Sequence, residues 1–179
     1  MTIADLKRTS TTERQRITEL FLSYHNLTDI SALAGRLKGV ETLYLGHNNL
    51  TDVSALAGLT GLDRLYLGYN KLTNISALSM LTNLKTLDLG CNNLTDISVL
   101  AGLTGLKTLY LEGNKLTDIA ALAGLKRLKS LALESNKLTD VSALAWLTGL
   151  ERLYLGGNNL TDDAIAALQK RLPNTVIFS

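Results

Sequence analysis

Residues 40–61 read VETLYLGHNNLTDVSALAGLTG, and from Val40 onward the chain restarts this unit every 22 residues. The asparagine three positions after the second strand leucine recurs as Asn48, Asn70, Asn92, Asn114, Asn136 and Asn158. One turn earlier its place is taken by His25, which stands 23 residues before Asn48 because of one extra residue near Arg36. The chain therefore contains seven turns of a repeat, of which the first is slightly irregular.

The apolar residues of each copy predict one short strand. Leu43 and Leu45 alternate with a variable residue, which is the period-two pattern of a strand with one buried side. The corresponding pairs in the other turns are Leu20/Leu22, Leu65/Leu67, Leu87/Leu89, Leu109/Leu111, Leu131/Leu133 and Leu153/Leu155. No turn can bury its leucines alone, so neighbouring turns must stack. The predicted fold is an α/β solenoid, a right-handed arc with a parallel β-sheet on its concave face and short 3₁₀ or helical turns on its convex face.

The polar residues of the unit have predicted roles in the turns. The amide of the repeated asparagine can both donate and accept, so it can satisfy turn backbone groups that would otherwise be buried without a partner. A second polar residue can cap the short helical turn of the return leg, and it is Asp29, Asp52, Asn74, Asp96, Asp118, Asp140 and Asp162. The aliphatic residue after it is expected to fill the convex half of the core, as in Ile30, Val53, Ile75, Ile97, Ile119 and Val141.

Each end of a solenoid needs a cover, because a bare end would expose a full layer of leucines. Residues 1–16 are predicted to form a small helical N-terminal cap, residues 17–160 the seven turns, and residues 161–179 a C-terminal cap, all within one domain. In this last segment we expect Asp162 to cap a helix that Pro173 ends. Ile165 and Leu168 should face inward, and residues 176–178 should add a last strand.

The pattern LxxLxLxxNxLTDISALAGL resembles the bacterial 22-residue leucine-rich repeat, as in the internalin family and the phosphatase-regulatory-subunit-like class. The resemblance covers about residues 17–172 and implies a leucine-rich-repeat arc whose concave face binds protein. It does not imply a surface-adhesin role, because the sequence has no long helical cap, immunoglobulin-like region or wall-anchoring tail of the kind that internalins carry.

Composition excludes several classes of partner. The 18 basic and 16 acidic residues give a formal charge of +2, which offers no electrostatic reason to expect nucleic acid or an anionic membrane. No apolar run approaches the ~20 residues that span a bilayer. Cys91 is the single cysteine and the first residues lack the apolar stretch of a secretory signal, so a cytoplasmic monomer is the expectation.

The residues between the strand leucines should point outward from the concave face, in columns along the sheet. The central column is Phe21, Tyr44, Tyr66, Asp88, Tyr110, Ala132 and Tyr154. The column before it is Glu19, Thr42, Arg64, Thr86, Thr108, Ser130 and Arg152. Two positions past the second leucine lie Tyr24, His47, Tyr69, Cys91, Gly113, Ser135 and Gly157. These columns hold all six tyrosines of the chain.

Two interpretations of the tyrosines stay open at this point. Tyrosine is enriched at binding hot spots because it offers a rigid contact area and a hydroxyl. It also has high β-propensity, and duplication of one unit would copy a purely structural ladder. We favour an interaction surface because the columns are broken: Asp88 and Ala132 replace the aromatic residue, and Glu112 and Glu134 replace glycine next to the column.

The predicted hot spot lies on the first three turns and consists of Phe21, Tyr24, Tyr44, His47, Tyr66 and Tyr69, with Arg64 beside them. A second, acidic patch is predicted from Asp88, Glu112 and Glu134. Tyr110, Arg152 and Tyr154 complete the predicted partner-binding set. On the convex side, Trp146 and Met80 replace glycine and are candidates for a small second contact site.

Nothing in the sequence predicts a catalytic, metal or cofactor site. His25, His47 and Cys91 lack the spacing of a zinc site or of a cysteine–histidine nucleophile pair, and no glycine-rich loop ends in GK[ST]. The sequence therefore predicts a protein–protein interaction module that is not an enzyme. The alternative is a structural spacer, or a consensus-designed scaffold without a native partner.

Overall fold

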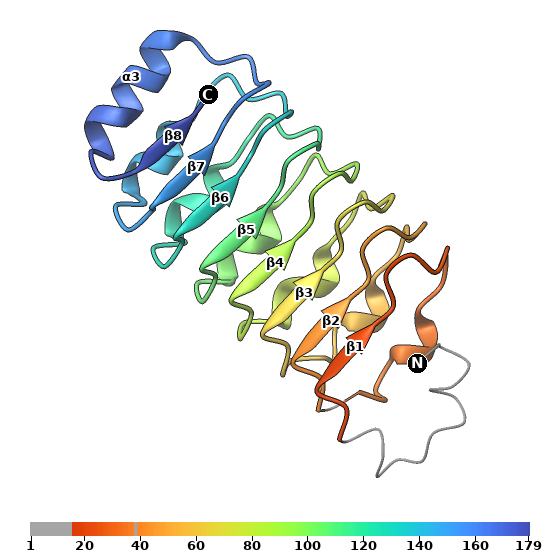
Figure 1. Ribbon diagram of the computed structural model, residues 1–179. Coiled ribbons are helices and arrows are strands. Elements are labelled where there is room, and N and C mark those ends of the chain that lie inside the picture. The colour runs from red at the N-terminus through yellow and green to blue at the C-terminus, as the bar shows by residue number, and fades with distance from the viewer. Residues whose placement is uncertain (1–15, 38) are drawn as a thin grey trace.

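The computed structural model describes residues 16–37 and 39–179, which form one continuous coil of stacked turns (Figure 1). Eight parallel strands pair in chain order in one sheet. They are β1 (Glu19–Phe21), β2 (Thr42–Tyr44), β3 (Arg64–Tyr66), β4 (Thr86–Asp88), β5 (Thr108–Tyr110), β6 (Ser130–Ala132), β7 (Arg152–Tyr154) and β8 (Val176–Phe178). The α/β solenoid is confirmed, whereas the N-terminal cap predicted for residues 1–16 lies almost entirely outside the described residues.

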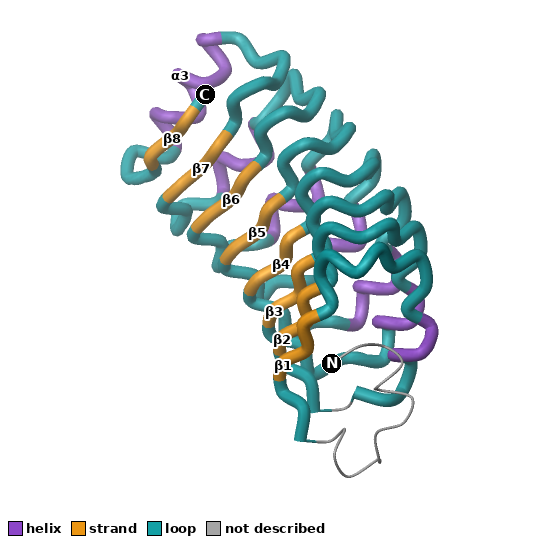
Figure 2. Tube along the Cα trace, turned by 45° about the vertical axis from the view of Figure 1, so that its right-hand side comes forward, coloured by secondary structure: helices purple, strands orange, loops and turns teal. Residues whose placement is uncertain are grey.

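Short 3₁₀ helices line the side of the coil opposite the sheet (Figure 2). They are η1 (Ser31–Leu33), η2 (Ser54–Leu56), η3 (Ser76–Met80), η4 (Ser98–Gly102), η5 (Ala120–Gly124) and η6 (Ser142–Trp146). In the six turns that contain a 3₁₀ helix, the polar residue predicted as its cap lies two positions before the first helical residue and accepts a hydrogen bond from the backbone N–H of that residue. Asp52 Oδ1 accepts a hydrogen bond from the backbone N–H of Ser54 at 2.8 Å, and the Ser54 hydroxyl donates to Asp52 Oδ2 at 2.7 Å. These bonds stabilise the carboxylate and lower the pKa of Asp52.

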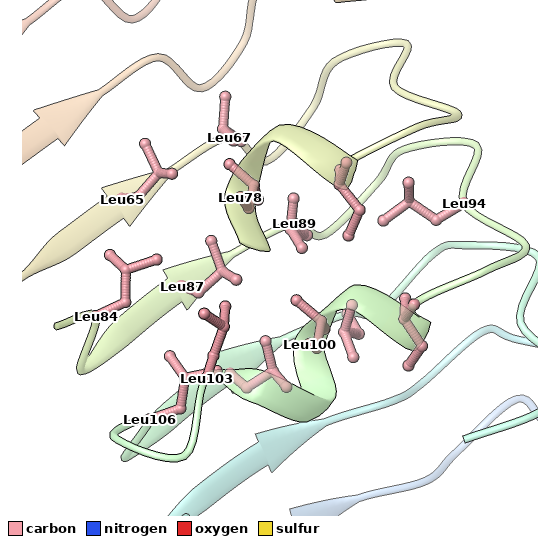
Figure 3. Close-up of a cluster of buried hydrophobic side chains, with 14 of the residues drawn as sticks. Leu65, Leu67, Leu78, Leu84, Leu87, Leu89, Leu94, Leu100, Leu103 and Leu106 are labelled. Atoms are coloured by element: carbon pink, nitrogen blue, oxygen red, sulfur yellow. The ribbon is translucent and has the colours of Figure 1, made fainter. Parts of the chain in front are cut away.

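The core is a stack of leucine layers between the sheet and the 3₁₀ helices (Figure 3). Within one layer the strand leucines Leu87 and Leu89 lie near Leu100 of η4, and all three are fully buried. Every predicted leucine pair and all six aliphatic residues predicted to fill the convex half of the core are likewise buried. Full burial of a leucine contributes about 1.5–3 kcal/mol, so the repeated layers supply the main stabilisation of the coil.

The repeated asparagines connect each turn to its neighbours. Asn92 Oδ1 accepts from the backbone N–H of Leu72 at 3.0 Å, and its Nδ2 donates to the carbonyls of Leu67 and Leu89, both at 3.1 Å. Equivalent bonds recur at Asn48, Asn70, Asn114, Asn136 and Asn158. The amide of Asn92 therefore satisfies backbone groups of its own turn and of the preceding turn, as predicted from its donor and acceptor capacity.

The C-terminal end is covered by α3 (Asp162–Arg171) and β8. The prediction that Asp162 caps this helix is wrong: the cap is Thr161, whose Oγ1 accepts from the backbone N–H of Ala164 at 3.2 Å. Thr161 has the extended backbone that a cap needs, whereas Asp162 is already helical. Leu168 faces the core as expected, and Ile165 is half-buried. No helix in the described part of the chain is long and apolar enough to cross a membrane.

We predict that Asn92→Ala destabilises the protein strongly, while Asn93→Ala at the next position does not. The first change leaves the buried N–H of Leu72 and two carbonyls without their amide partner, at about 1–3 kcal/mol for each group left unsatisfied. Asn93 is only half-buried, so its truncation removes no such bond. The two urea midpoints provide the measurement, and equal midpoints would contradict the role assigned to Asn92.

Candidate functional site

Three aromatic rings of the central column stack on the first three strands. The ring centroids of Phe21 and Tyr44 lie 4.6 Å apart, and those of Tyr44 and Tyr66 lie 4.7 Å apart, with the rings nearly parallel. The strand register causes this, because Phe21, Tyr44 and Tyr66 occupy the same position of β1, β2 and β3. The ring spacing equals the distance between neighbouring strands.

A second aromatic row runs beside the first. The ring of His47 stacks between those of Tyr24 and Tyr69, with centroid distances of 4.2 Å on both sides. The structure places this row in the turn just after each strand, where Tyr24, His47 and Tyr69 have φ values of 63°, 54° and 57°. This left-handed backbone costs a residue with a side chain about 1–2 kcal/mol. Gly113 and Gly157 hold the same place with positive φ and without that cost.

We call these six residues, Phe21, Tyr24, Tyr44, His47, Tyr66 and Tyr69, the aromatic face. The structure brings together all the members that the sequence predicted. Phe21 is exposed by 58%, Tyr24 by 73% and Tyr69 by 55%, whereas Tyr44 and Tyr66 are half-buried. Arg64 lies at one border of the aromatic face, and its Nε is 3.5 Å from the carboxylate of Asp63, which also pairs with Lys85.

The three predicted acidic residues follow the aromatic face along the sheet, and we call Asp88, Glu112 and Glu134 the acidic row. Asp88 Oδ1 accepts from the backbone N–H of Gly90 at 3.0 Å, and its carboxylate lies over Gly68. Glu112 leans over Gly90 in the same way. A Cβ atom at Gly68 or Gly90 would overlap these carboxylates, so the glycines before the acidic row provide its space.

Two carboxylates of the acidic row, those of Asp88 and Glu112, lie in surroundings that disfavour their charged form. Burial raises the pKa of Asp88 above its ordinary value. Burial also raises the pKa of Glu112, and the neighbouring carboxylates of Asp88 and Glu134 raise it further. Among the described residues, Oε2 of Glu112 and Oε2 of Glu134 are buried without a hydrogen-bond partner. Perturbed, incompletely paired carboxylates of this kind are enriched at functional sites.

The aromatic column is interrupted a second time at Ala132, on the same turn as Glu134 of the acidic row. Ala132 stands between Tyr110 and Tyr154 in the strand register, and a hollow of about 550 Å³ opens there. Tyr154 stacks on Phe178 at a centroid distance of 4.6 Å. The sequence prediction missed Phe178 because it lies 24 residues after Tyr154, outside the 22-residue period. Aligning residues 176–178 with β7 by their alternating inward and outward side chains would have placed Phe178 next to Tyr154 in the column.

The convex side carries a separate hollow beside Trp146. It has a volume of about 640 Å³ and lies between η5, η6 and α3, with Ala143 and Ala167 in its lining. The Trp146 ring is 60% exposed, and Lys126 Nζ and Arg171 Cζ lie 5.7 and 5.9 Å from its centre. Met80 is also exposed but does not line this hollow.

In the described part of the chain, no group of three or more histidine, cysteine, aspartate or glutamate residues is arranged to hold a metal ion. Cys91 is a free thiol next to Tyr69, and its interaction with the phenol raises the pKa of Tyr69. The chemistry available on the sheet is therefore that of aromatic contact and of unpaired negative charge.

Known proteins similar to this chain are leucine-rich-repeat proteins. A model described as leucine-rich repeats (2 copies) matches residues 60–102 and 104–146, and two further leucine-rich-repeat models match residues 15–72 and 148–168. A search of curated proteins returned no match.

Solved structures show the same similarity in three dimensions. An internalin (inlF) of Listeria monocytogenes has 32% identity and a TM-score of 0.86, over 96% of this chain and 50% of that one. Internalin C2 of the same organism has 29% identity and a TM-score of 0.84, over 94% of this chain and 83% of that one. A leucine-rich-repeat protein of Leptospira interrogans has 25% identity and a TM-score of 0.73, over 95% and 51%. The chain thus spans half the length of the first internalin.

We predict that Glu112→Gln stabilises the protein at pH 7. A carboxyl group whose pKa is raised by folding favours the fold at low pH, and this contribution is lost as the pH rises through the folded-state pKa. Replacing the charge should raise Tm at pH 7 by about 2–4 °C, which corresponds to about 1 kcal/mol. The gain should vanish at pH 3.5, where the wild-type carboxyl is protonated in both states. Calorimetry at the two pH values measures this.

Glu151→Gln is the matched control, because Glu151 is an exposed surface residue paired with Lys129 at 3.2 Å. Surface ion pairs of this kind contribute little to stability. The Tm of Glu151→Gln should therefore change by less than the Tm of Glu112→Gln, and it should not rise. A lower Tm for Glu112→Gln at pH 7 would contradict the cost assigned to the acidic row.

Proposed function

Because the chain belongs to the leucine-rich-repeat family and its repeats are internalin-like, we propose that it is an interaction module that binds a partner protein on the concave face of its sheet. Leucine-rich-repeat proteins in general bind proteins, and a structural neighbour with 28% identity and a TM-score of 0.69 is a TDR receptor. The fold alone does not assign a partner or a surface, so the proposal depends on this chain's own residues.

The aromatic face is the observation that carries the proposal. Six rings form two adjacent rows on the first three turns, and the outermost of them are more than half exposed. Contiguous exposed aromatic surface of this kind is uncommon on proteins without a partner. Burying such rings under a partner supplies the contact area and the rigidity of a binding hot spot.

The structural-ladder interpretation accounts only for the aromatic column on the strands. That ladder would need only Phe21, Tyr44 and Tyr66, which have ordinary strand backbone. Positive φ occurs at the position of the second row in every turn, also at Cys91 and Ser135, so this backbone is a property of the repeat. The aromatic side chains that stand there in the first three turns form a second stacked row that a strand ladder does not need, and this row supports a binding role.

The proposed role is that of a monomeric binder without catalysis. The aromatic face and the acidic row offer contact area and charge, and the partner we propose is a protein with an apolar contact surface bordered by basic residues. Complementary charge would orient this partner along the sheet, with its apolar part over the first three turns.

We predict that Tyr44→Ala combined with Tyr66→Ala weakens partner binding at least about 30-fold, the size of a hot-spot loss. The test compares captures from a lysate of the source organism by the immobilised wild type and by the double variant, followed by titration of the purified captured protein. Trp146→Ala is the control, because it removes an exposed aromatic residue from the convex side.

The proposal requires a protein that the wild type and Trp146→Ala capture and the double variant does not. Equal affinity of the double variant would remove the aromatic face from the interaction. A wild type that captures nothing specific would favour the alternative of a structural spacer. Circular dichroism of the double variant checks the fold, which should persist because both rings lie on the solvent side of the sheet.

A further inference from the structure

The interruption at Ala132 creates a slot in the sheet surface with two aromatic walls. Ala132 pairs with Tyr110 of β5 on one side and with Tyr154 of β7 on the other. The hollow of about 550 Å³ at this place is lined by both tyrosines, with Ala132 between them as its floor. Ala132 itself is buried, with 6% of its surface exposed, and its methyl group does not reach into the hollow as a tyrosine at this position would.

The width of the slot follows from the stacking in the rest of the column. Neighbouring rings are 4.6 to 4.7 Å apart wherever the column is uninterrupted. Two strand steps therefore place Tyr110 and Tyr154 about 9.4 Å apart, which is room for one planar group stacked on both rings. A planar group can contact both ring faces over its whole area, whereas a tetrahedral group touches each face only at one side.

The electrostatics of the slot favour a cation at one end. Glu112 and Glu134 line it on the side where the strands end, and one oxygen of each carboxylate is buried without a partner among the described residues. Glu112 leans toward Gly90 on the side of the preceding turn, and Glu134 belongs to the same turn as the floor residue Ala132, so we take Glu134 as the carboxylate that pairs with the cation. Gly156, the next member of this column, has no side chain that could fill the space beyond Glu134.

The opposite end of the slot carries groups that would orient a long ligand. Thr108, Ser130 and Arg152 line it there, two residues before the floor and walls. Arg152 is exposed and would repel a second positive charge at that end. A cationic group entering the slot is thereby directed toward Glu134.

We propose that this slot binds the guanidinium group of an arginine side chain on the partner protein, stacked between Tyr110 and Tyr154 and paired with Glu134. Guanidinium is planar and cationic, stacks on aromatic faces and pairs with carboxylates through two parallel hydrogen bonds. The ammonium group of lysine has the charge but cannot form the double stack. The raised pKa of Glu112 supports this assignment, because a bound cation would relieve the repulsion within the acidic row.

This inference rests on the proposed function and adds the residue type that the partner contributes. The first experiment needs no partner. Ethylguanidinium is titrated into the protein carrying ¹³C-labelled tyrosine, and the ring signals are followed by NMR. We expect saturable shifts of the Tyr110 and Tyr154 signals with a millimolar Kd, and unchanged signals of Tyr44 and Tyr66. Butylammonium should bind at least about fivefold more weakly, since it cannot stack.

Two variants and a matched control locate the binding. Ala132→Tyr should abolish the shifts by filling the slot, and it should fold because tyrosine occupies the same register position in β2, β3, β5 and β7. Glu134→Gln should weaken binding about tenfold, by loss of a charge-assisted pair. Glu151→Gln makes the same change of charge outside the slot and should leave Kd unchanged.

The result that overturns the inference is an absence of saturable shifts at Tyr110 and Tyr154, or equal binding of butylammonium. Unchanged binding by Ala132→Tyr would also overturn it. None of these outcomes depends on the aromatic face, so the capture test with Tyr44 and Tyr66 judges the proposed function separately. If that capture succeeds, Ala132→Tyr should also weaken binding of the captured protein, and equal affinity would show that the partner does not use the slot.

Discussion

From the second turn onward, the side-chain amide of one asparagine on each turn sets the position of that turn relative to the one before it. In the fourth full turn this is Asn92, which holds carbonyls of two successive turns and one N–H of the preceding turn. These backbone groups lie where the strand ends and water is excluded, so leaving them unpaired would be costly. Only a side chain that donates and accepts at once can satisfy them. The leucine layers supply the stabilisation, and the asparagine supplies the alignment.

The alignment of the turns also determines where side chains lie on the surface of the sheet. Because successive turns are in register, equal positions of neighbouring copies lie one strand spacing apart, which is also a favourable stacking distance for aromatic rings. The same register converts one small residue, Ala132, into a slot with two aromatic walls. Since each turn contacts mainly its neighbours, exposed positions can vary without changing the fold. The aromatic face, the acidic row and the slot are therefore three surfaces on one constant scaffold.

The aromatic face and the acidic row both include residues that lower the stability of the fold. The second aromatic row has bulky side chains at a left-handed position where other turns have Gly113 and Gly157, and the acidic row includes Asp88 and Glu112, whose pKa values burial has raised. Neither feature improves the packing of the core, which is complete beneath them. Locally unfavourable residues that persist on a strongly stabilised scaffold are characteristic of binding sites.

The 22-residue period by itself determined the fold, the buried leucines and the columns of exposed residues, because each follows from spacing along the chain. Spacing could not choose Thr161 over Asp162 as the helix cap, since both are good caps and the backbone angles of the folded chain decide between them. It also missed Phe178, which the C-terminal cap brings into the column from outside the period. The positive φ of Tyr24, His47 and Tyr69 and the slot over Ala132 exist only once turns are stacked, because a backbone angle and a gap between neighbours are properties of tertiary structure.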